Sequence, residues 1–414
     1  MKVALVHDWL LKLGGAERVL IALHRIFPEA PIHTLFYDKS FSGRYLGKAE
    51  IRPSFLQKIP NIKKLHPWFK FLMPSAAESF DFSRFDLVIS SSHEFVHGVI
   101  TRPETKLISY YHSPSRLLWD RSHDYLRDFR KRNPEPLKLA LIRIGQHFLR
   151  LWDWPAARRP NVMVANSKHV AERIKKYYGR DAKVIYPPVE VPRGSNSSRS
   201  FSLVQRLAPR ASAFLPLLRQ GFGGDHAKKA AESARRTAPA RLTNDAYFLI
   251  VSQLYPHKNL DLAVQTFKKL PEFDLVIIGQ GPERKRLQKM IGESGNIKLS
   301  GFVPDEELPN YYENCLAYLI CNEEDFGISS VEAMFFGKPV LALRKGGSTE
   351  SVIKGETGEF FDREDEESLK EGVNLIHGKI KKRHYDSQKI SKHAENFGFE
   401  RFKKEMLEIV NEMG

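Results

Sequence analysis

The sequence has few cysteines, no long apolar run and no two aspartates spaced two positions apart. Cys315 and Cys321 are the only cysteines among the 414 residues. Both lie in one apolar segment, which predicts reduced core thiols rather than a disulfide or metal site. No run approaches the ~20 apolar residues of a membrane-spanning helix. The N-terminus has an apolar stretch too short for a signal peptide and typical of a buried strand. We therefore expect a cytoplasmic protein.

Positive charge is unevenly distributed along the chain. The formal net charge is +16 at pH 7, which suggests an anionic partner. Residues 194–243 hold nine basic and two acidic side chains, and they contain neither isoleucine nor tyrosine. A connection of this length is far longer than an ordinary loop. We interpret it as a basic linker or insertion; a basic amphipathic patch for anionic lipid and a reading-frame artefact are the alternatives.

Strand-like and helix-like segments alternate on both sides of this basic segment. Strands are expected at residues 3–6, 86–90, 106–111, 161–165, 247–251, 273–278, 297–301, 317–321 and 339–343. Helices are expected at 16–27, after the cap candidate Ser167, and at 260–270, 283–291, 306–314, 328–336 and 400–413. Apolar strands with short links to helices predict parallel sheets covered on both faces. The fold class is therefore α/β, with two tandem doubly wound, Rossmann-like domains.

The strongest chemical signal is a pair of carboxylates eight positions apart, Glu324 and Glu332. Glu324 falls in a glycine-containing turn after an expected strand, and Glu332 falls in the helix that follows. Such a turn presents free backbone N–H groups and the positive end of a helix at the edge of a sheet. Carboxylates accept hydrogen bonds from neighbouring hydroxyls, as on a sugar ring or a ribose. The pattern therefore favours a ligand rich in phosphate and hydroxyl groups.

This motif resembles the hallmark of family-four retaining glycosyltransferases, a Glu, seven residues and a second Glu within a Glu-(Gly/Asp)-Phe-Gly…Glu-Ala-Met pattern. Features of the mannosyltransferase-type subgroup of bacterial and archaeal polysaccharide assembly also occur in the N-terminal half. They are Val6–Leu10, Gly14–Glu17, Ser90–His93, His112–Pro114, Ala165–Ser167 and Tyr186–Val189. The resemblance covers residues 1–193 and 244–414. It implies the two-domain GT-B architecture, with the donor cleft between the domains.

The resemblance assigns a role to each expected domain. Residues 1–193 would bind the acceptor and residues 244–396 the nucleotide sugar, with 194–243 as the basic linker or insertion. The C-terminal helix, residues 397–414, would pack back on the N-terminal domain.

The resemblance also implies roles for residues in the C-terminal half. Glu324 would bind hydroxyls of the transferred sugar, Glu332 the ribose, and Lys258 would neutralise the diphosphate leaving group. Backbone amides of Phe326, Gly327 and Ile328 would hold sugar and phosphate. The family usually has an arginine where this chain has Gln253. Because a charge-assisted contact contributes about 1.5–3 kcal/mol, diphosphate binding here is either weaker or helped by another base.

Glycine loops and histidines complete the implied site. Donor-lining loops would be those at Gly14 and Gly15, at Gly346 and Gly347, and at Phe302 and Val303. Ser348 is a candidate helix cap, and Glu350 is either structural or near the nucleotide. His112, at the end of a strand, would contact the donor sugar across the cleft and be important for catalysis. His93 is a weaker candidate for acceptor binding.

The implied reaction is a metal-independent, retaining transfer of a hexose, mannose from GDP-mannose, to a glycan or lipid-linked acceptor. No cofactor is expected besides the donor, because the Asp-x-Asp motif and any His/Cys ligand cluster are absent from the sequence. The alternatives are a UDP-hexose donor on the same fold, a nucleotide-sugar epimerase or hydrolase, and a non-catalytic nucleotide-sugar-binding or membrane scaffold protein.

One further segment bears on the partners of the protein. Residues 58–73 interleave lysines with Trp68, Phe69 and Phe71, a composition that suits an anionic membrane or a lipid-linked acceptor. An ordinary surface segment covering the core is the alternative interpretation. Peripheral contact with the inner membrane face is therefore predicted, and no nucleic-acid partner is expected.

Overall fold

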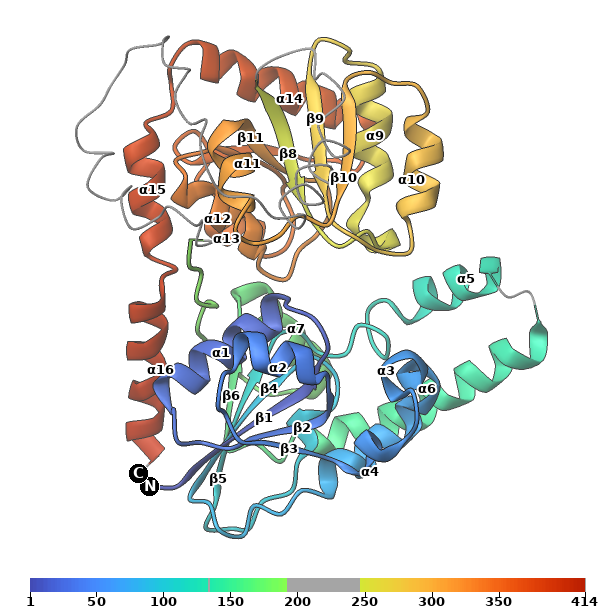
Figure 1. The fold of residues 1–414 in the computed structure, drawn as a ribbon, viewed down its shortest axis with the longest axis vertical. Helices are drawn as coiled ribbons and strands as arrows, with labels where there is room; N and C mark the ends of the chain where they lie inside the picture. The colour runs from blue at the N-terminus through green and yellow to red at the C-terminus, as the bar shows by residue number, and fades with distance from the viewer. Residues whose placement is uncertain (133–134, 192–245, 414) are drawn as a thin grey trace, which may run out of the picture.

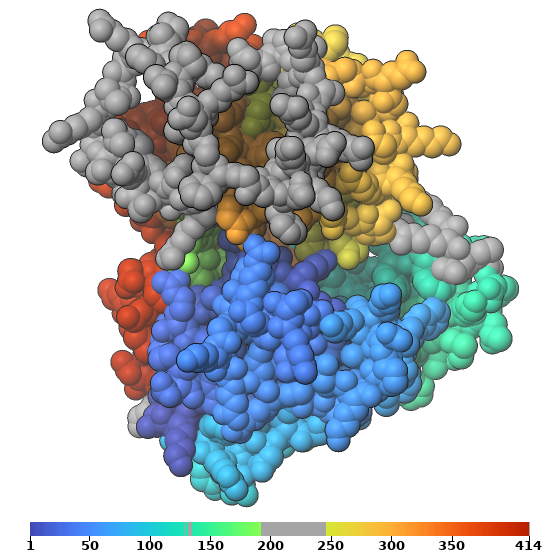
Figure 2. Space-filling model, in the orientation of Figure 1, coloured from blue at the N-terminus to red at the C-terminus, as the bar shows by residue number. Residues whose placement is uncertain are grey.

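The computed structural model describes residues 1–132, 135–191 and 246–413. The basic segment 194–243 lies outside the described residues. Two α/β domains lie one above the other in Figure 1, and their surfaces meet in Figure 2. Each is built on one parallel sheet, with seven strands in the N-terminal domain and six in the C-terminal domain. The prediction of two doubly wound, Rossmann-like domains in a GT-B arrangement is confirmed.

The N-terminal sheet has the strand order β3-β2-β1-β4-β5-β6-β7. Its strands are β1 (Val3–Leu10), β2 (Ile32–Tyr37), β3 (Ile51–Pro53), β4 (Leu87–Ser92), β5 (Lys106–Tyr111), β6 (Val162–Ala165) and β7 (Lys183–Val184). The helices are α1 (Gly15–Ile26), α2 (Lys39–Tyr45), η1 (Phe55–Lys58), α3 (Ile62–Leu65), η2 (His66–Leu72), α4 (Met73–Glu78), η3 (Val96–Gly98), α5 (Ser122–Arg132), α6 (Pro136–Ala156) and α7 (Lys168–Tyr178).

The C-terminal sheet has the order β10-β9-β8-β11-β12-β13. Its strands are β8 (Tyr247–Val251), β9 (Asp274–Ile278), β10 (Ile297–Gly301), β11 (Cys315–Ile320), β12 (Val340–Leu343) and β13 (Gly358–Phe361). The helices are η4 (Pro256–Lys258), α9 (Leu260–Lys268), α10 (Arg284–Ile291), α11 (Leu308–Asn314), α12 (Ile328–Phe335), α13 (Ser348–Ser351), α14 (Glu366–Lys381), α15 (Ser387–Glu395) and α16 (Phe399–Met413).

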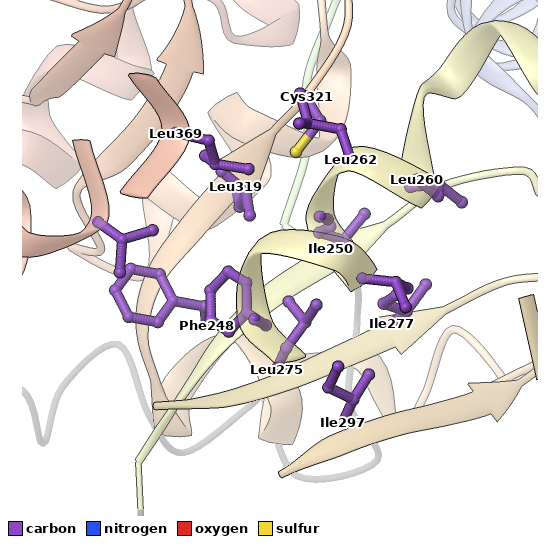
Figure 3. Packing of buried hydrophobic residues seen from close by; sticks show 14 of the residues in the cluster. Phe248, Ile250, Leu260, Leu262, Leu275, Ile277, Ile297, Leu319, Cys321 and Leu369 are labelled. Carbon is purple, nitrogen blue, oxygen red and sulfur yellow. The ribbon is translucent and has the colours of Figure 1, made fainter. Parts of the chain in front are cut away.

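Both faces of each sheet are buried in apolar cores. In the C-terminal domain one core cluster lies between the sheet and helices α9, α10 and α14, and Figure 3 shows Phe248, Leu275 and Leu319 among its side chains. A second cluster covers the other face and includes residues of α11, α12 and α15. This two-sided burial explains why the central strands read as continuous apolar runs.

The last helix, α16, returns to the N-terminal domain. Figure 1 shows it beside that domain, with the two chain ends close together. Phe402, Met406 and Ile409 belong to the same buried cluster as Leu5 and Leu20 of β1 and α1. The C-terminal helix is thus part of the N-terminal core, although the whole C-terminal sheet precedes it in sequence.

Several boundaries differ from those expected. β1 extends to Leu10 rather than to residue 6, because the buried His7 and the residues up to Leu10 continue the pairing with β2. Ser348 is the first residue of α13, and Gly347 is its N-cap without a side-chain hydrogen bond, so the prediction of Ser348 as the cap is wrong. Both cysteines are free and buried, as predicted. Among the described helices, none is long and apolar enough to cross a membrane.

Candidate active site

Both sheets present loops at the points where their strand order reverses, between β1 and β4 and between β8 and β11. Ligands of doubly wound sheets bind beyond the carboxyl ends of strands at such points. The loops that follow β1, β5, β8 and β11 carry Gly14, His112, Lys258 and Glu324 respectively. The fold therefore places most of the predicted site residues on the facing edges of the two domains.

The Glu324 loop is fixed by a second loop that follows β12. The backbone N–H of Gly347 donates to the carbonyl of Glu324 at 2.8 Å, and Glu324 and Gly346 form an isolated parallel bridge. Gly346 has a φ of +66°, and a Cβ atom there would lie 2.3 Å from the Glu324 carbonyl oxygen. Only glycine permits both this backbone conformation and this close approach. The two predicted glycine loops therefore form one packed unit.

Lys258 and Glu324 are paired directly. The Lys258 Nζ lies 2.7 and 2.8 Å from the two carboxylate oxygens of Glu324, and about a fifth of each side chain is exposed. Lys258 ends η4, just after β8, and Glu324 follows β11, so neighbouring strands bring them together. A mostly buried cation beside a carboxylate, which can accept hydrogen bonds from hydroxyl groups, suits a sugar that is linked to a phosphate.

Glu332 lies on α12 and is 2% exposed. The Tyr312 hydroxyl donates to one carboxylate oxygen at 2.7 Å, and the Arg18 guanidinium of the N-terminal domain lies 2.9 Å from the other. The charge of Glu332 raises the pKa of Arg18. Burial, followed by the charge of Glu332, raises the pKa of Tyr312 well above its usual range. Glu332 is therefore the acceptor of a buried, charge-assisted network that spans both domains.

The glycine pair after β1 lies at the domain boundary. Gly14 is the N-cap of α1, and a Cβ atom on Gly15 would lie 3.0 Å from Cδ1 of Ile328 in the C-terminal domain. Beside this loop, the Lys12 Nζ donates to the Gln253 amide oxygen at 3.1 Å. A cation thus lies next to the position where the sequence lacks the usual arginine.

Three imidazole rings gather beside β1, β4 and β5: His7 lies within β1, and His93 and His112 directly follow β4 and β5. The Ser91 hydroxyl bridges His7 Nδ1 at 3.1 Å and His112 Nε2 at 2.8 Å, and the rings of His7 and His93 are 5.9 Å apart. Burial, followed by the charges of His7 and His93, holds the pKa of His112 well below its usual range. His112 is therefore neutral at pH 7, able to act as a hydrogen-bond partner rather than as a cation.

Asp8 organises the loop that carries His93. Its carboxylate accepts hydrogen bonds from the backbone N–H groups of four consecutive residues, 93–96, at 2.7–3.1 Å, and the His93 Nδ1 lies 3.1 Å away. Burial alone would raise the pKa of Asp8, but the charge of His93 and these backbone hydrogen bonds hold it below its usual range. His93 also meets Trp9 edge to face.

Two arginines of the N-terminal domain hold the Glu324 loop from across the domain boundary. Arg116 and Arg173 both donate to Oδ1 of Asp325, at 2.6 and 2.8 Å, and Arg173 also donates to Ser113 at 2.9 Å. Ser113 directly follows His112. The loop after β5 and the loop after β11 are therefore connected through Asp325.

With this geometry in view, comparison with known proteins gives the family. The description "Glycosyltransferase Family 4" matches residues 13–193, and "Glycosyl transferases group 1" matches residues 233–393. The two models together cover most of the chain, which therefore belongs to the family-four glycosyltransferases of the GT-B fold.

Among the curated relatives of this glycosyltransferase are two with mannosyl-transfer names. The GDP-mannose-dependent alpha-(1-6)-phosphatidylinositol monomannoside mannosyltransferase of Mycolicibacterium smegmatis is 29% identical over 30% of this chain and 36% of its own length. Mannosylfructose-phosphate synthase of Agrobacterium fabrum is 26% identical over 53% of this chain and 45% of its own length. The matches thus span less than half the length of these relatives.

Solved structures agree on the fold. HepE of Anabaena, in complex with UDP, superposes over the full length of both chains with a TM-score of 0.64 and 18% identity. Sucrose-phosphate synthase of Thermosynechococcus elongatus superposes over 100% of this chain and 99% of its own with a TM-score of 0.65 and 14% identity.

Glu350 makes structural contacts in this glycosyltransferase. The sequence had allowed either a structural role for this residue or a position near the nucleotide. Its carboxylate accepts from the backbone N–H groups of Lys168 and His169 at 2.7 and 2.9 Å. It therefore caps the N-terminus of α7, in the other domain. The neighbouring His169 lies 2.9 Å from Glu323 and, by hydrogen bonding, lowers the pKa of that carboxylate to about 2.

The remaining predicted residues differ in exposure. Phe326 is buried and its ring packs against Tyr186 and Phe397. Val303 is buried in the C-terminal core, whereas the neighbouring Phe302 is 63% exposed. Gly327, with a φ of +89°, is the N-cap of α12. Phe326, Gly327 and Val303 could therefore contact a donor only through their backbones, whereas Phe302 could also do so through its side chain.

Sequence reasoning missed the cations that cross between the domains. Arg116 follows His112-Ser113-Pro114 closely, which was a usable signal, whereas Arg18 and Arg173 lie within helices whose contacts no local pattern reveals. Lys12 lies two positions before Gly14, but its contact with Gln253 joins residues 241 positions apart. These partners depend on how the domains meet.

Proposed function

We propose that the protein transfers mannose from GDP-mannose to a glycan or lipid-linked acceptor, with retention of the anomeric configuration. The observation that carries the proposal is the pairing of Lys258 with Glu324 on the loop that follows β11, with Glu332 on the adjoining helix. In this arrangement Glu324 would bind the sugar hydroxyls, Glu332 the ribose, and Lys258 the diphosphate. The backbone N–H groups at the start of α12 would add to the phosphate site.

Mannose as the transferred sugar is supported by the names of the two relatives described above. The Mycolicibacterium enzyme is named as GDP-mannose-dependent and the Agrobacterium enzyme as a mannosylfructose-phosphate synthase. A UDP-hexose is the competing donor, because the Anabaena neighbour is also described in complex with UDP-glucose.

The proposed chemistry is a same-face displacement without a metal ion. The leaving diphosphate would accept the proton of the acceptor hydroxyl, while cations and helix N-termini stabilise its charge. Lys258 and, beside Gln253, Lys12 are the cations placed for this role. His112, held neutral beside Ser91, would hydrogen-bond a hydroxyl of the donor sugar.

Glu324→Gln tests the site. The substitution keeps the shape of the side chain but removes the charge that pairs with Lys258 and accepts sugar hydroxyls, so transfer should fall by at least about a hundredfold. The measurement is mannosyl transfer from GDP-mannose, with the melting temperature as a check of folding. Glu364→Gln, at an ion pair with Lys345 on the surface, is the matched control. Turnover close to that of the control would refute the assignment.

A donor panel tests the specificity separately. Calorimetric titration with GDP-mannose and UDP-glucose, in chelator, should give tighter binding of GDP-mannose. Tighter binding of UDP-glucose would favour the alternative donor while leaving the site assignment intact. Dependence of transfer on added divalent metal would contradict the metal-free mechanism.

A non-catalytic nucleotide-sugar-binding or scaffold role is the second candidate, favoured by the uncharged Gln253 and the basic segment 194–243. It predicts donor binding without transfer to any acceptor. The cytoplasmic location and the contact of residues 58–73 with an anionic membrane stay predictions.

A further inference from the structure

Helix α6 has one face fixed against the N-terminal domain. The Asp153 carboxylate is fully buried and accepts hydrogen bonds from Trp119 at 2.7 Å and Tyr178 at 2.9 Å. The Gln146 amide donates to the Leu117 carbonyl at 3.1 Å. These buried polar contacts hold the helix in one rotation about its axis, so the direction of its opposite face is also determined.

The opposite face of α6 is an exposed apolar stripe. Its members are Leu137, Leu141, Ile144, Phe148 and Leu151, with exposed fractions of 72%, 59%, 53%, 64% and 59%. Their spacing of four, three, four and three residues places them along one side of the helix. Single exposed apolar residues are ordinary, but a continuous stripe of this kind marks an interaction surface. In Figure 1, α5 and α6 project from the side of the N-terminal domain.

Basic side chains border this stripe. Residues 136–152 contain Lys138, Arg143 and Arg150 and no aspartate or glutamate. At 100° per residue, Arg143 and His147 lie on one side of the stripe and Lys138 on the other, whereas the half-buried Arg150 lies towards the opposite face. An apolar face edged by cations is the pattern of helices that lie in the plane of a membrane surface.

A second exposed aromatic group belongs to the neighbouring η2. Trp68 and Phe71 are 65% and 64% exposed. Other residues of η2, Phe69 and Leu72, pack against the same buried cluster as Leu149 of α6. The predicted segment 58–73 and α6 are therefore parts of one structural unit.

We propose that the outer face of α6 docks on the surface of an anionic lipid bilayer, with its apolar stripe in the headgroup region and its basic border on the lipid charges. Charge decides between the candidate occupants. A second copy of α6 would bring like charge to the stripe, and so would the basic segment 194–243, whereas anionic lipid complements it. The proposal does not depend on the identity of the donor.

Vesicle sedimentation of the full-length chain tests this surface. The wild-type chain should bind vesicles of phosphatidylcholine mixed with phosphatidylglycerol, and bind pure phosphatidylcholine vesicles at least about tenfold more weakly. The double variant Ile144→Glu/Phe148→Glu should lose about tenfold or more of the binding to the mixed vesicles. Ile353→Glu/Leu375→Glu, which adds the same charge at two exposed apolar positions of the C-terminal domain, should bind as the wild type does.

Two results would overturn the proposal. One is equal vesicle binding by the double variant and its control, with both melting as the wild type does. The other is an absence of vesicle binding by the wild type together with self-association in sedimentation velocity that Ile144→Glu/Phe148→Glu abolishes, which would make the stripe a contact between copies. Donor binding by calorimetry should be unchanged in both double variants, so failure of this surface is distinguishable from failure of the donor site.

Discussion

At the scale of single residues, the proposed phosphate side of the site has a glutamine where the resemblance implies an arginine. Gln253 is uncharged, and the Lys12 Nζ lies 3.1 Å from its amide oxygen. A lysine supplied by the N-terminal domain can contribute the charge that the C-terminal domain lacks. It can do so only while the domains are together, which couples donor binding to domain closure.

Lys12→Ala should weaken binding of the nucleotide-sugar donor by about tenfold, because one charge-assisted contact is lost. Gln253→Arg should recover most of that affinity in the Lys12→Ala background. In the presence of Lys12 it should gain less, because two cations would lie side by side. The dissociation constants of the four chains, measured by calorimetry, give the coupling directly. Equal affinities of wild type and Lys12→Ala would mean that another base serves the diphosphate.

His112 makes the stability of the protein depend on pH. Its folded pKa lies well below 6.5 because of burial and the nearby imidazoles, while the unfolded ring titrates near 6.5. Below that pH the unfolded chain binds a proton that the folded chain does not, so this contribution to stability falls as the pH falls. The free energy of unfolding of the wild type, relative to His112→Asn, should therefore be smaller at pH 5 than at pH 7. His147→Asn, on the exposed face of α6, is the control; a pH-independent difference for His112→Asn would contradict the assignment.

At the scale of elements, the site depends on two loops that touch through their backbones. A Cβ atom on Gly347 would lie 2.3 Å from the Asp325 carbonyl oxygen and 2.5 Å from Cα of Phe326. There is no room for a side chain between these loops. The position of Glu324 therefore depends on glycine, which has no side chain, at position 347.

Gly347→Ala should displace the Glu324 loop and reduce transfer by at least about tenfold, at a cost of about 1–3 kcal/mol in stability from overpacking. Gly378→Ala is the matched control, because it lies inside α14 with open space where the methyl group would be. That change should stabilise the protein by about 0.5–1 kcal/mol and leave transfer unchanged. Steady-state kinetics and chemical denaturation of both variants measure the two effects. Unchanged transfer in Gly347→Ala would show that Glu324 tolerates movement of its loop.

At the scale of the whole molecule, the domains are joined by charge. Asp325 pairs with Arg116 and Arg173, Glu332 with Arg18, and all three arginines come from the N-terminal domain. Arg173 keeps Asp120 as a partner within its own domain. If the domains separated, Arg173 would therefore still be paired with Asp120.

Asp325→Ala should shift the protein towards a more open arrangement of its domains, because two interdomain ion pairs are lost. Small-angle scattering should then give a larger radius of gyration than for the wild type. Asp181→Ala removes an exposed ion pair with Lys175 inside one domain and should leave the scattering unchanged. If Asp325→Ala scatters as the wild type does, the remaining contacts are sufficient to keep the domains together.

The sequence by itself determined the parts of this protein that rest on local patterns. The alternation of apolar strands with amphipathic helices predicted the two sheets through most of their strands, and the Phe-Gly turn with Glu324 and Glu332 indicated the loop of the proposed site. The strands β2, β3, β7 and β13 were not predicted. β3 and β7 have only two or three residues, which carry too little pattern to separate them from loops, and His33 and Thr34 interrupt the apolar run of β2.

Only the tertiary structure decided which residues meet across the domain boundary. Arg18, Arg116, Arg173 and Lys12 find their partners in the other domain, and a contact between distant segments leaves no periodicity in the sequence. The same holds for α6, whose apolar positions would suit a core equally well. Burial of Asp153 turns one face of that helix inward, and the apolar stripe is left exposed because nothing in the described part of the chain packs over it.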